Sequence, residues 1–434
     1  MHNQDNRSVE SSRLQSKHFL LITLTAGYAI AMIDRQLLVI VQESIKADLG
    51  LSDSQLGLLT GFAFALFYSF FGIPLGRIAD KRNQTKFIAI CMVVWSAFTA
   101  MVGGAHSFWH LLLLRIGVAA GEAGITPASC SLIARLYSPD KRSAAMSFYT
   151  IGAPIGLLIG FALGGRLEAA VGWRVAFIIA SLPGILLAIF MLLFWKKPVN
   201  DNAGVERDEL SLWEGLSHLW RARTIRILAI ATPLNAFLAF APQVWSVSYL
   251  VRVHEISIVT VGTWLGLSFG VGGIIGILAT GLMADWLGKK NIKWKMWLLA
   301  LNAGAGGILL VAGLLAPDGI TALVCFLIPF ALGSSYAGVS LSIVNTLAPE
   351  KFRATASAMF ILVANIFGMG LGIWFVGIVS DALAPSFGVA SIQYSLIITL
   401  PIAALLTVIS YIAAGNCLSH DLSGTQDGYK NSCP

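Results

Sequence analysis

Long apolar segments recur along the whole chain, and no other feature restricts its fold as strongly. Each run has about 20 residues, the length that a helix needs to cross a bilayer. The composition agrees, because 56% of the residues are hydrophobic, 12% are charged and the mean hydropathy is +0.77. We predict an all-α membrane protein with twelve transmembrane helices. The predicted spans are 19–45, 53–76, 87–104, 108–135, 144–166, 174–195, 225–250, 258–283, 296–315, 319–347, 354–380 and 391–414.

Basic residues are unevenly distributed between the loops. If the N-terminus is inside, the tails and the loops on the same side hold 23 of the 29 lysine and arginine residues. This bias follows the positive-inside rule, so we expect both termini in the cytoplasm and the protein in a bacterial inner membrane. The same distribution excludes a nucleic-acid partner, which a net charge of +7 would otherwise suggest. The five cysteines have neither disulfide nor zinc spacing, and we expect no metal and no cofactor.

Four charged residues inside two spans are the clearest functional signal. The first span carries Asp34 and Arg35, and the fourth carries Arg115 and Glu122. A charge at that depth costs from about 3 to more than 10 kcal/mol, so such residues mark substrate or ion pathways. We expect one arginine to bind an anion and one acid to carry a proton. A purely structural ion pair is the alternative.

Helical geometry limits how these four side chains face. Arg115 and Glu122 are seven residues apart and share one face of their helix. Asp34 and Arg35 are adjacent, so their directions differ by about 100° and one should face a cavity while the other packs against a neighbouring helix. Aromatic residues of the second span, Tyr68 among them, line this cavity, face the lipid or pack against a neighbouring helix.

An internal repeat divides the chain into two halves. The segment 76–80 closes the second span and its counterpart 281–285 closes the eighth; similarly, Ser138-Pro-Asp-Lys matches Ala348-Pro-Glu-Lys. Two parallel six-helix halves follow. The predicted divisions are a cytoplasmic tail (1–18), an N-terminal bundle (19–195), a linker with an interfacial helix (196–223), a C-terminal bundle (224–416) and a cytoplasmic tail (417–434).

The second copy of this repeat reads GLMADWLGKK from Gly281 to Lys290, which closely resembles the loop signature of the major facilitator superfamily. The first copy departs from it, because Asn83 and Gln84 replace a glycine and a basic residue. The Asp34-Arg35 pair and the stretch Arg115–Ala123 resemble the spinster-like branch. The resemblance implies two pseudo-symmetric halves that transport by alternating access. Eukaryotic members of that branch are linked to lysophospholipids and sphingosine phosphate.

The resemblance also implies a latch at the cytoplasmic surface. A carboxylate there caps a neighbouring helix and pairs with arginine, at up to about 2 kcal/mol. A topogenic charge cluster is the alternative. The expected latch residues are Asp80, Arg82, Arg142, Asp285 and Arg353.

Glycines recur every four residues in the fifth span, from Gly152 to Gly164, and Gly57 and Gly61 repeat this spacing in the second. Small residues at this interval allow helices to approach closely. In the family, the second span packs against the eleventh and the fifth against the eighth. We therefore expect these glycines to line the surfaces along which the halves move.

These features predict a proton-coupled secondary transporter of an amphipathic or organic anion, such as a lysolipid. Its expected partners are that anion, protons and membrane lipids, and we expect a monomer. The alternative within transport is a symporter of a small organic acid or sugar acid. A non-transporting receptor or scaffold would lack the buried charges or carry large soluble domains. The chain is not expected to be an enzyme, because no histidine lies in the interior of a span, where it could act as a base.

Overall fold

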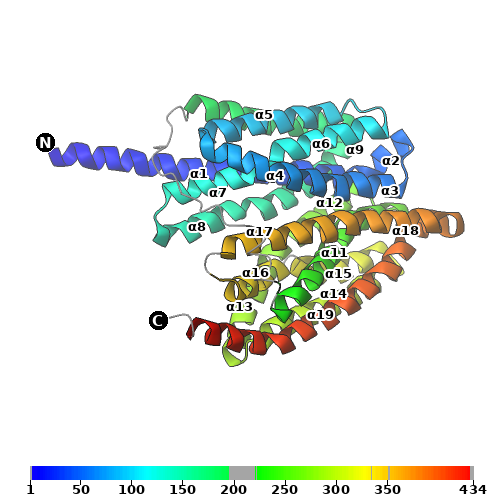
Figure 1. Cartoon of the computed structure of the whole chain (residues 1–434). Coiled ribbons are helices and arrows are strands. Elements are labelled where there is room, and N and C mark those ends of the chain that lie inside the picture. The colour runs from blue at the N-terminus through cyan, green and yellow to red at the C-terminus, as the bar shows by residue number, and fades with distance from the viewer. Residues whose placement is uncertain (1, 195–219, 221, 334, 350–351, 431–434) are drawn as a thin grey trace. The chain divides into compact units, whose positions relative to one another are not determined.

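The computed structural model is built of helices throughout its described part (Figure 1). It describes the backbone of residues 2–194, 220, 222–333, 335–349 and 352–430, and their side chains except those of 2–16, 80, 354 and 423–430. The interfacial helix predicted within 196–223 lies almost wholly outside these residues. The first and last helices continue past the predicted spans, to His2 and Lys430.

Ten helical stretches of the described chain are long and apolar enough to cross a membrane. Two of them, Pro139–Phe194 and Thr355–Leu422, have 56 and 68 residues. Since one span needs about 20 residues, each of these two has the length of two spans. In the first, Gly172 interrupts the helix with a φ of 76°, a backbone conformation that glycine adopts without a steric penalty. The ten stretches are thus consistent with the predicted twelve spans.

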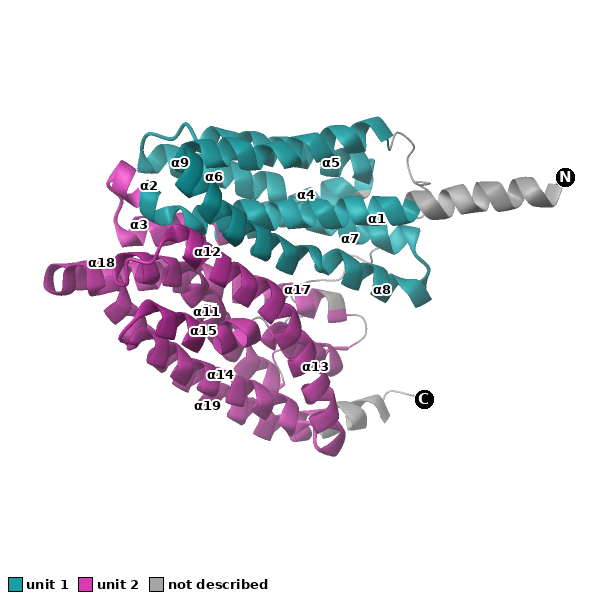
Figure 2. Ribbon diagram, turned by 180° about the vertical axis from the view of Figure 1, so that it is seen from behind, with its two compact units in different colours: residues 1–45, 66–204 teal, residues 46–65, 205–434 magenta. Residues whose placement is uncertain are grey.

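The chain divides into two compact units by its internal contacts (Figure 2). Unit 1 comprises Met1–Ile45 and Leu66–Gly204, and unit 2 comprises Lys46–Ala65 and Val205–Pro434. The segment Lys46–Ala65 is therefore flanked on both sides by unit 1, yet belongs to unit 2.

Unit 1 is a helix bundle in which the first helix packs along the long helix that contains the fifth span. A buried core that includes Leu24, Trp95, Leu132 and Tyr149 joins the first helix to three other helices of the bundle. Its helices are α1 (His2–Ile40), the main part of α4 (Ala63–Lys81), α5 (Gln84–Val102), α6 (Phe108–Ala123), α7 (Ile125–Leu136), α8 (Pro139–Thr150) and α9 (Gly152–Phe194).

Unit 2 is a second bundle, in which α19 packs against α11 and α14. Its elements from the middle of the chain are α11 (Arg223–Arg252), α12 (Ile258–Leu267), η2 (Ser268–Gly272), α13 (Gly273–Lys290), α14 (Lys293–Leu314), α15 (Gly319–Gly333) and α16 (Tyr336–Leu347). The chain then continues with α17 (Arg353–Val363), η4 (Ala364–Leu371), α18 (Gly372–Phe387), η5 (Gly388–Ala390) and α19 (Ser391–Lys430). The end of α2 (Gln42–Leu49) and all of α3 (Asp53–Gly57) and η1 (Leu58–Phe62) also belong to unit 2.

The repeat seen in the sequence recurs in local geometry. The π-helical segment η1 interrupts the second span, and η2 interrupts the eighth. Arg142 Nη2 donates to Ala134 O at 2.7 Å, and Arg353 Nε donates to Asn345 O at 3.1 Å. Each arginine thus binds a carbonyl near the end of the helix before it, where the helix dipole favours a positive charge.

The glycines of the two spans have different neighbours. A Cβ at Gly156 would lie 2.4 Å from Met32 Cβ and 2.5 Å from Ala29 O, both on α1. The fifth-span glycines therefore bring α9 against α1 inside unit 1. The expectation that these glycines line the surface between the two halves is wrong. A Cβ at Gly57 would lie 2.9 Å from Ile373 O, so the expected packing of the second span on the eleventh is confirmed.

Candidate functional site

The four predicted membrane charges come together in unit 1, where α1 faces α6. α6 begins at a capped end, with Ser107 Oγ accepting a hydrogen bond from His110 N at 3.2 Å, and it runs as one helix through both of its charges. The pairing is crossed. Arg35 binds Glu122, and Arg115 approaches Asp34.

Side-chain length explains the crossing. Residues seven apart on α6 are separated by about 10 Å along its axis, whereas Asp34 and Arg35 differ by only about 1.5 Å in height on α1. A short carboxylate cannot cover this distance, but a long arginine side chain can. Arg35 therefore reaches along the bundle to Glu122, and Arg115 reaches back to Asp34.

The Arg35–Glu122 pair has short contacts and unequal exposure. Arg35 Nε donates to Glu122 Oε2 at 2.7 Å, and Arg35 Nη2 lies 2.7 Å from the same oxygen. The Arg35 side chain keeps 20% of its surface exposed, against 1% for Glu122. Glu122 Oε1 has no hydrogen-bond partner among the described residues. The pair thus combines a partly accessible cation with a buried carboxylate that accepts hydrogen bonds on only one of its two oxygens.

The Asp34–Arg115 pair is looser and more deeply buried. Arg115 Nη1 lies 3.9 Å from Asp34 Oδ2, and neither side chain exposes more than 3% of its surface. Within the described part of the chain, neither oxygen of Asp34 accepts a hydrogen bond. These two residues are buried in the bundle, whereas Arg35 is partly open, as the 100° divergence of the adjacent residues predicts. Their transport roles stay a prediction.

An aromatic ring fixes the accessible arginine. The guanidinium carbon of Arg35 lies 4.7 Å from the ring centre of Tyr68, within the range of a cation–π contact. Tyr68 also contacts Thr126, with 3.5 Å between the two hydroxyl oxygens. The aromatic spacing in the second span identified Tyr68, but not its contact with Arg35, which depends on how two distant segments pack.

Two stacked tyrosines were not singled out by the sequence. The rings of Tyr28 and Tyr149 are 5.0 Å apart and nearly parallel, at 15°. Tyr28 precedes Arg35 by two helical turns, so both lie on one face of α1. Tyr149 is 1% exposed, and its hydroxyl has no hydrogen-bond partner among the described residues. Isolated tyrosines in two separate spans carry no sequence pattern that predicts this stack.

Three of the predicted latch residues contact other partners within their own units. Asp285 Oδ1 forms an ion pair with Lys295 Nζ at 2.9 Å, while Arg142 and Arg353 bind the helix ends described above. Arg82 is exposed, and the side chain of Asp80 lies outside the described residues. The latch stays a prediction. No group of three or more potential metal ligands gathers in the part of the chain that the structure describes.

Comparisons with known proteins agree with this architecture. A model of the Major Facilitator Superfamily matches residues 24–373. An MFS-type efflux pump of Mycolicibacterium smegmatis is 31% identical over 396 residues, which cover 90% of each chain. A probable L-galactonate transporter of Escherichia coli is 28% identical over 66% of this chain and 65% of its own length. The crystal structure of a bacterial homologue of the human lysosomal transporter spinster, inward-facing and unoccupied, is 25% identical with a TM-score of 0.82, covering 93% of this chain and 98% of its own.

Proposed function

The chain belongs to the major facilitator superfamily and is a membrane transporter rather than an enzyme, and from this premise we propose that it moves an amphipathic or organic anion by proton-coupled alternating access. One observation carries the proposal. A partly exposed arginine, Arg35, is bound to a buried carboxylate, Glu122, that retains an unused oxygen. An anion that reaches Arg35 competes directly with Glu122.

This competition links substrate binding to proton binding. The planar guanidinium binds a carboxylate or phosphate through two parallel hydrogen bonds, which favours an anionic head group. Once Arg35 turns to the substrate, Glu122 is left buried without its counter-ion. An uncompensated buried charge costs about 3–5 kcal/mol, so Glu122 takes up a proton instead. The substrate anion and the proton are then bound together.

The deeper pair has a supporting role in this proposal. Asp34 and Arg115 are each at most 3% exposed, so they are not the first groups that an anion meets. They keep one negative and one positive charge beside the Arg35–Glu122 pair, and Asp34 is a second position for the proton. Tyr68 holds the Arg35 guanidinium in place and reduces the entropy that binding costs.

Two substrate classes remain. The similarity to a spinster homologue, together with the resemblance to the spinster-like branch, whose eukaryotic members are linked to lysophospholipids, supports an amphipathic anion such as a lysolipid, which is our first choice. The probable L-galactonate transporter supports a sugar acid. Both carry an anionic head that suits Arg35, and they differ in the tail. We also propose that the protein is a monomer in a bacterial inner membrane. Its termini are proposed to lie in the cytoplasm, as the distribution of lysine and arginine indicates.

Purified protein in liposomes separates these classes. Lysolipids, sugar acids and small monocarboxylates are first screened for an increase in thermal stability, because a ligand that binds only the folded state raises the melting temperature. Uptake of each hit is then measured with and without a pH gradient. We expect accumulation that a protonophore abolishes. If uptake of the same substrate does not depend on the pH gradient, the proposed proton coupling is refuted. If only cations bind, the proposed anionic substrate is refuted.

A further inference from the structure

Three tryptophans and three lysines gather in unit 2, where α13 ends and α14 begins. These six residues, called the patch below, are Trp286, Lys289, Lys290, Lys293, Trp294 and Trp297. We propose that the patch binds the head group of an anionic phospholipid. The proposal does not depend on which anion is transported.

The tryptophans of the patch face outward from the bundle. Trp286 on α13 and both tryptophans of α14 keep 36–58% of their surface exposed. The rings of Trp294 and Trp297 meet edge to face, with 5.2 Å between their centres. Tryptophan combines an apolar ring with one N–H donor, so it suits the boundary between lipid head groups and acyl chains. Both helices therefore offer rings at the depth where a phosphate lies.

Exposed apolar side chains continue from these tryptophans along each helix. On α13, Leu278 and Leu282 precede Trp286 by about two turns and one turn. On α14, Leu301 follows Trp297 by about one turn, and it too is exposed. Acyl chains can pack along these two apolar stripes while their head group lies against the patch.

The positive charges of this region are largely uncompensated. From 286 to 300 the sequence has four lysines and no acid. Within the described part of the chain, only Lys295 of these four forms an ion pair, with Asp285 at 2.9 Å. Lys290 instead lies over an aromatic ring, with 4.3 Å between its Nζ and the ring centre of Trp286. A phosphate at the patch would supply negative charge that the neighbouring sequence lacks.

Helix stability explains only some of these lysines. Lys289 and Lys290 lie in the last turn of α13, where the helix dipole favours a positive charge. Lys293 lies at the start of α14, where the dipole disfavours it, and the first turn of α14 contains no acid. An external anion removes this unfavourable arrangement.

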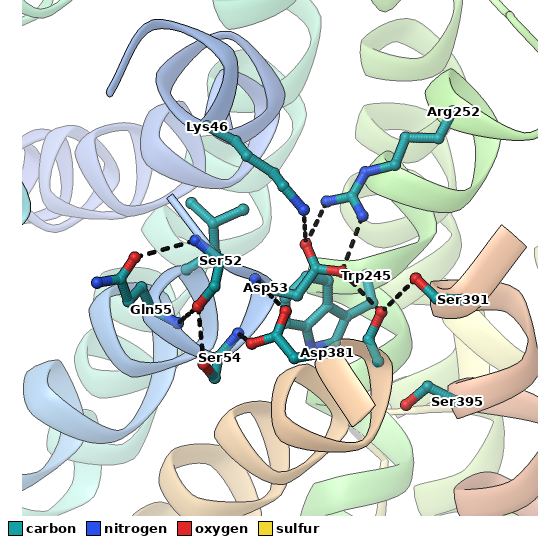
Figure 3. A network of polar contacts seen from close by, with 12 residues as sticks. Lys46, Ser52, Asp53, Ser54, Gln55, Trp245, Arg252, Asp381, Ser391 and Ser395 are labelled. Atoms are coloured by element: carbon teal, nitrogen blue, oxygen red, sulfur yellow. Dashed lines mark hydrogen bonds and ion pairs between the residues drawn. The ribbon is translucent and has the colours of Figure 1, made fainter. Parts of the chain in front are cut away.

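At the opposite membrane surface, unit 2 neutralises its basic side chains internally. α11 and α13 belong to successive spans, so their last residues, Arg252 and Lys290, lie at opposite surfaces. Arg252 Nη1 and Nη2 bind the two carboxylate oxygens of Asp53 at 2.9 and 2.6 Å. Lys46 and Ser380 contact the same carboxylate (Figure 3). The excess of positive charge at the patch is therefore a local feature and not a property of every span end in unit 2.

The corresponding turn of unit 1 has the charges without the tryptophans. It carries Lys81, Arg82 and Lys86, but the sequence has no tryptophan from 76 to 94. The positive-inside rule accounts for basic residues in both turns. It does not account for three exposed tryptophans in one of them. Lysines close to the membrane surface attract anionic lipids, and the added rings turn this attraction into a site for one head group.

Quenching by spin-labelled lipids tests the patch in vesicles. Asn291→Cys, an exposed position in the turn between α13 and α14, carries an NBD fluorophore in a cysteine-free background. The vesicles contain increasing fractions of 5-doxyl phosphatidylglycerol or, in separate samples, 5-doxyl phosphatidylcholine. We expect half-maximal quenching at a roughly tenfold lower fraction of phosphatidylglycerol, because several lysines attract its charged head group. High salt should weaken this preference.

Matched lysine variants separate a site from general charge attraction. Lys289→Gln with Lys290→Gln should abolish the preference for phosphatidylglycerol at position 291. Lys81→Gln with Lys86→Gln removes the same charge from unit 1 and should preserve it. Equal quenching by the two lipids in the parent would overturn the proposal, as would an equal loss of preference in both double variants.

Two further measurements address the rings and a different occupant. Trp286→Leu keeps every charge and should reduce the preference severalfold; an unchanged preference would leave only general attraction by lysine and overturn the proposal. If a second copy covers the patch instead, proteins labelled at 291 with donor and acceptor fluorophores should show energy transfer without any lipid preference. No substrate is present, so each of these results leaves the anion proposal untouched.

Discussion

Arg35 contacts Glu122 through two nitrogens, Nε and Nη2, and both lie 2.7 Å from the same carboxylate oxygen, Oε2. The second oxygen, Oε1, has no hydrogen-bond partner among the described residues, although the Glu122 side chain is 1% exposed. A buried acceptor without a partner is costly, and such groups in native proteins often have a functional reason. Oε1 is therefore an open position for a proton once Arg35 turns to the substrate. This relationship motivates the first two predictions.

Glu122→Gln keeps the shape of the side chain but cannot bind a proton near neutral pH. If one proton accompanies each univalent anion, a gradient of one pH unit supports about tenfold accumulation in the parent. We expect the ratio in Glu122→Gln to fall to about one, while exchange of labelled for unlabelled substrate continues. Both are measured in liposomes. Undiminished accumulation in the variant would show that Glu122 does not carry the proton.

Arg35→Lys and Arg115→Lys should have different effects, because only the first arginine is accessible. Lysine keeps the charge and loses the planar fork. For Arg35→Lys we expect about tenfold weaker substrate binding, since one charge-assisted hydrogen bond contributes roughly 1.5 kcal/mol, with little change in stability. For Arg115→Lys we expect the free energy of unfolding to fall by about 1–3 kcal/mol, because buried groups lose their partners.

Substrate titration and thermal melting of ligand-free protein distinguish the two arginine variants. Arg166→Lys is the matched control, because Arg166 is exposed and donates to Ala162 O at 2.7 Å on its own helix. It should change neither quantity. Equal affinity of Arg35→Lys and the parent for every substrate would exclude Arg35 as the anion site.

The sequence was sufficient to find the charged residues but not their pairing. Charges inside apolar spans are visible because each is energetically costly there, so Asp34, Arg35, Arg115 and Glu122 could be named in advance. Their crossed arrangement depends on the relative height of α1 and α6, which no local pattern encodes. The fifth-span glycines illustrate the same limit. Their spacing predicted close packing, but the partner turned out to be α1.

Asp53 was missed for a related reason. A single acid at the start of a span has the pattern of an ordinary helix-start residue, and Ser52 beside it reinforces that interpretation. Its partners Arg252 and Ser380 are 199 and 327 residues away in the sequence. The helical periods that reveal spans and repeats act over a few turns, so they cannot predict ion pairs across such separations.

Gly156→Ala tests the close packing of α9 on α1. The added methyl group would lie 2.5 Å from Ala29 O, a backbone atom that cannot move aside alone. Overpacking of this kind costs about 1–3 kcal/mol, so we expect a lower melting temperature. Gly338→Ala is the control, because no atom lies within 4 Å of its added Cβ and alanine favours the helix. Equal melting temperatures for Gly156→Ala and the parent would contradict this packing.

His254 should make stability depend on pH, and it lies between two candidate spans. Its Nε2 is 2.7 Å from the Tyr249 hydroxyl, which itself donates to Gly313 O at 3.0 Å, so the imidazole must supply the proton of the shared contact. Partial burial lowers the pKa of His254, against the opposing effect of Asp318. The unfolded chain therefore binds a proton at a higher pH than the folded chain does. The contribution of neutral His254 to the free energy of unfolding is fully present above about pH 6.5. It is lost as the pH falls below that value.

His254→Gln removes this titration while keeping a donor at the same position. Melting temperatures measured from pH 8 to pH 5 should fall less steeply in the variant than in the parent, with the two curves separating below about pH 6.5. His106→Gln, which changes an exposed loop histidine, should reproduce the parent curve. Parallel curves for His254→Gln and the parent would mean that His254 has the same proton affinity in the folded and the unfolded chain. A steeper decline in the variant would reverse the sign and show that the charged imidazole stabilises the fold.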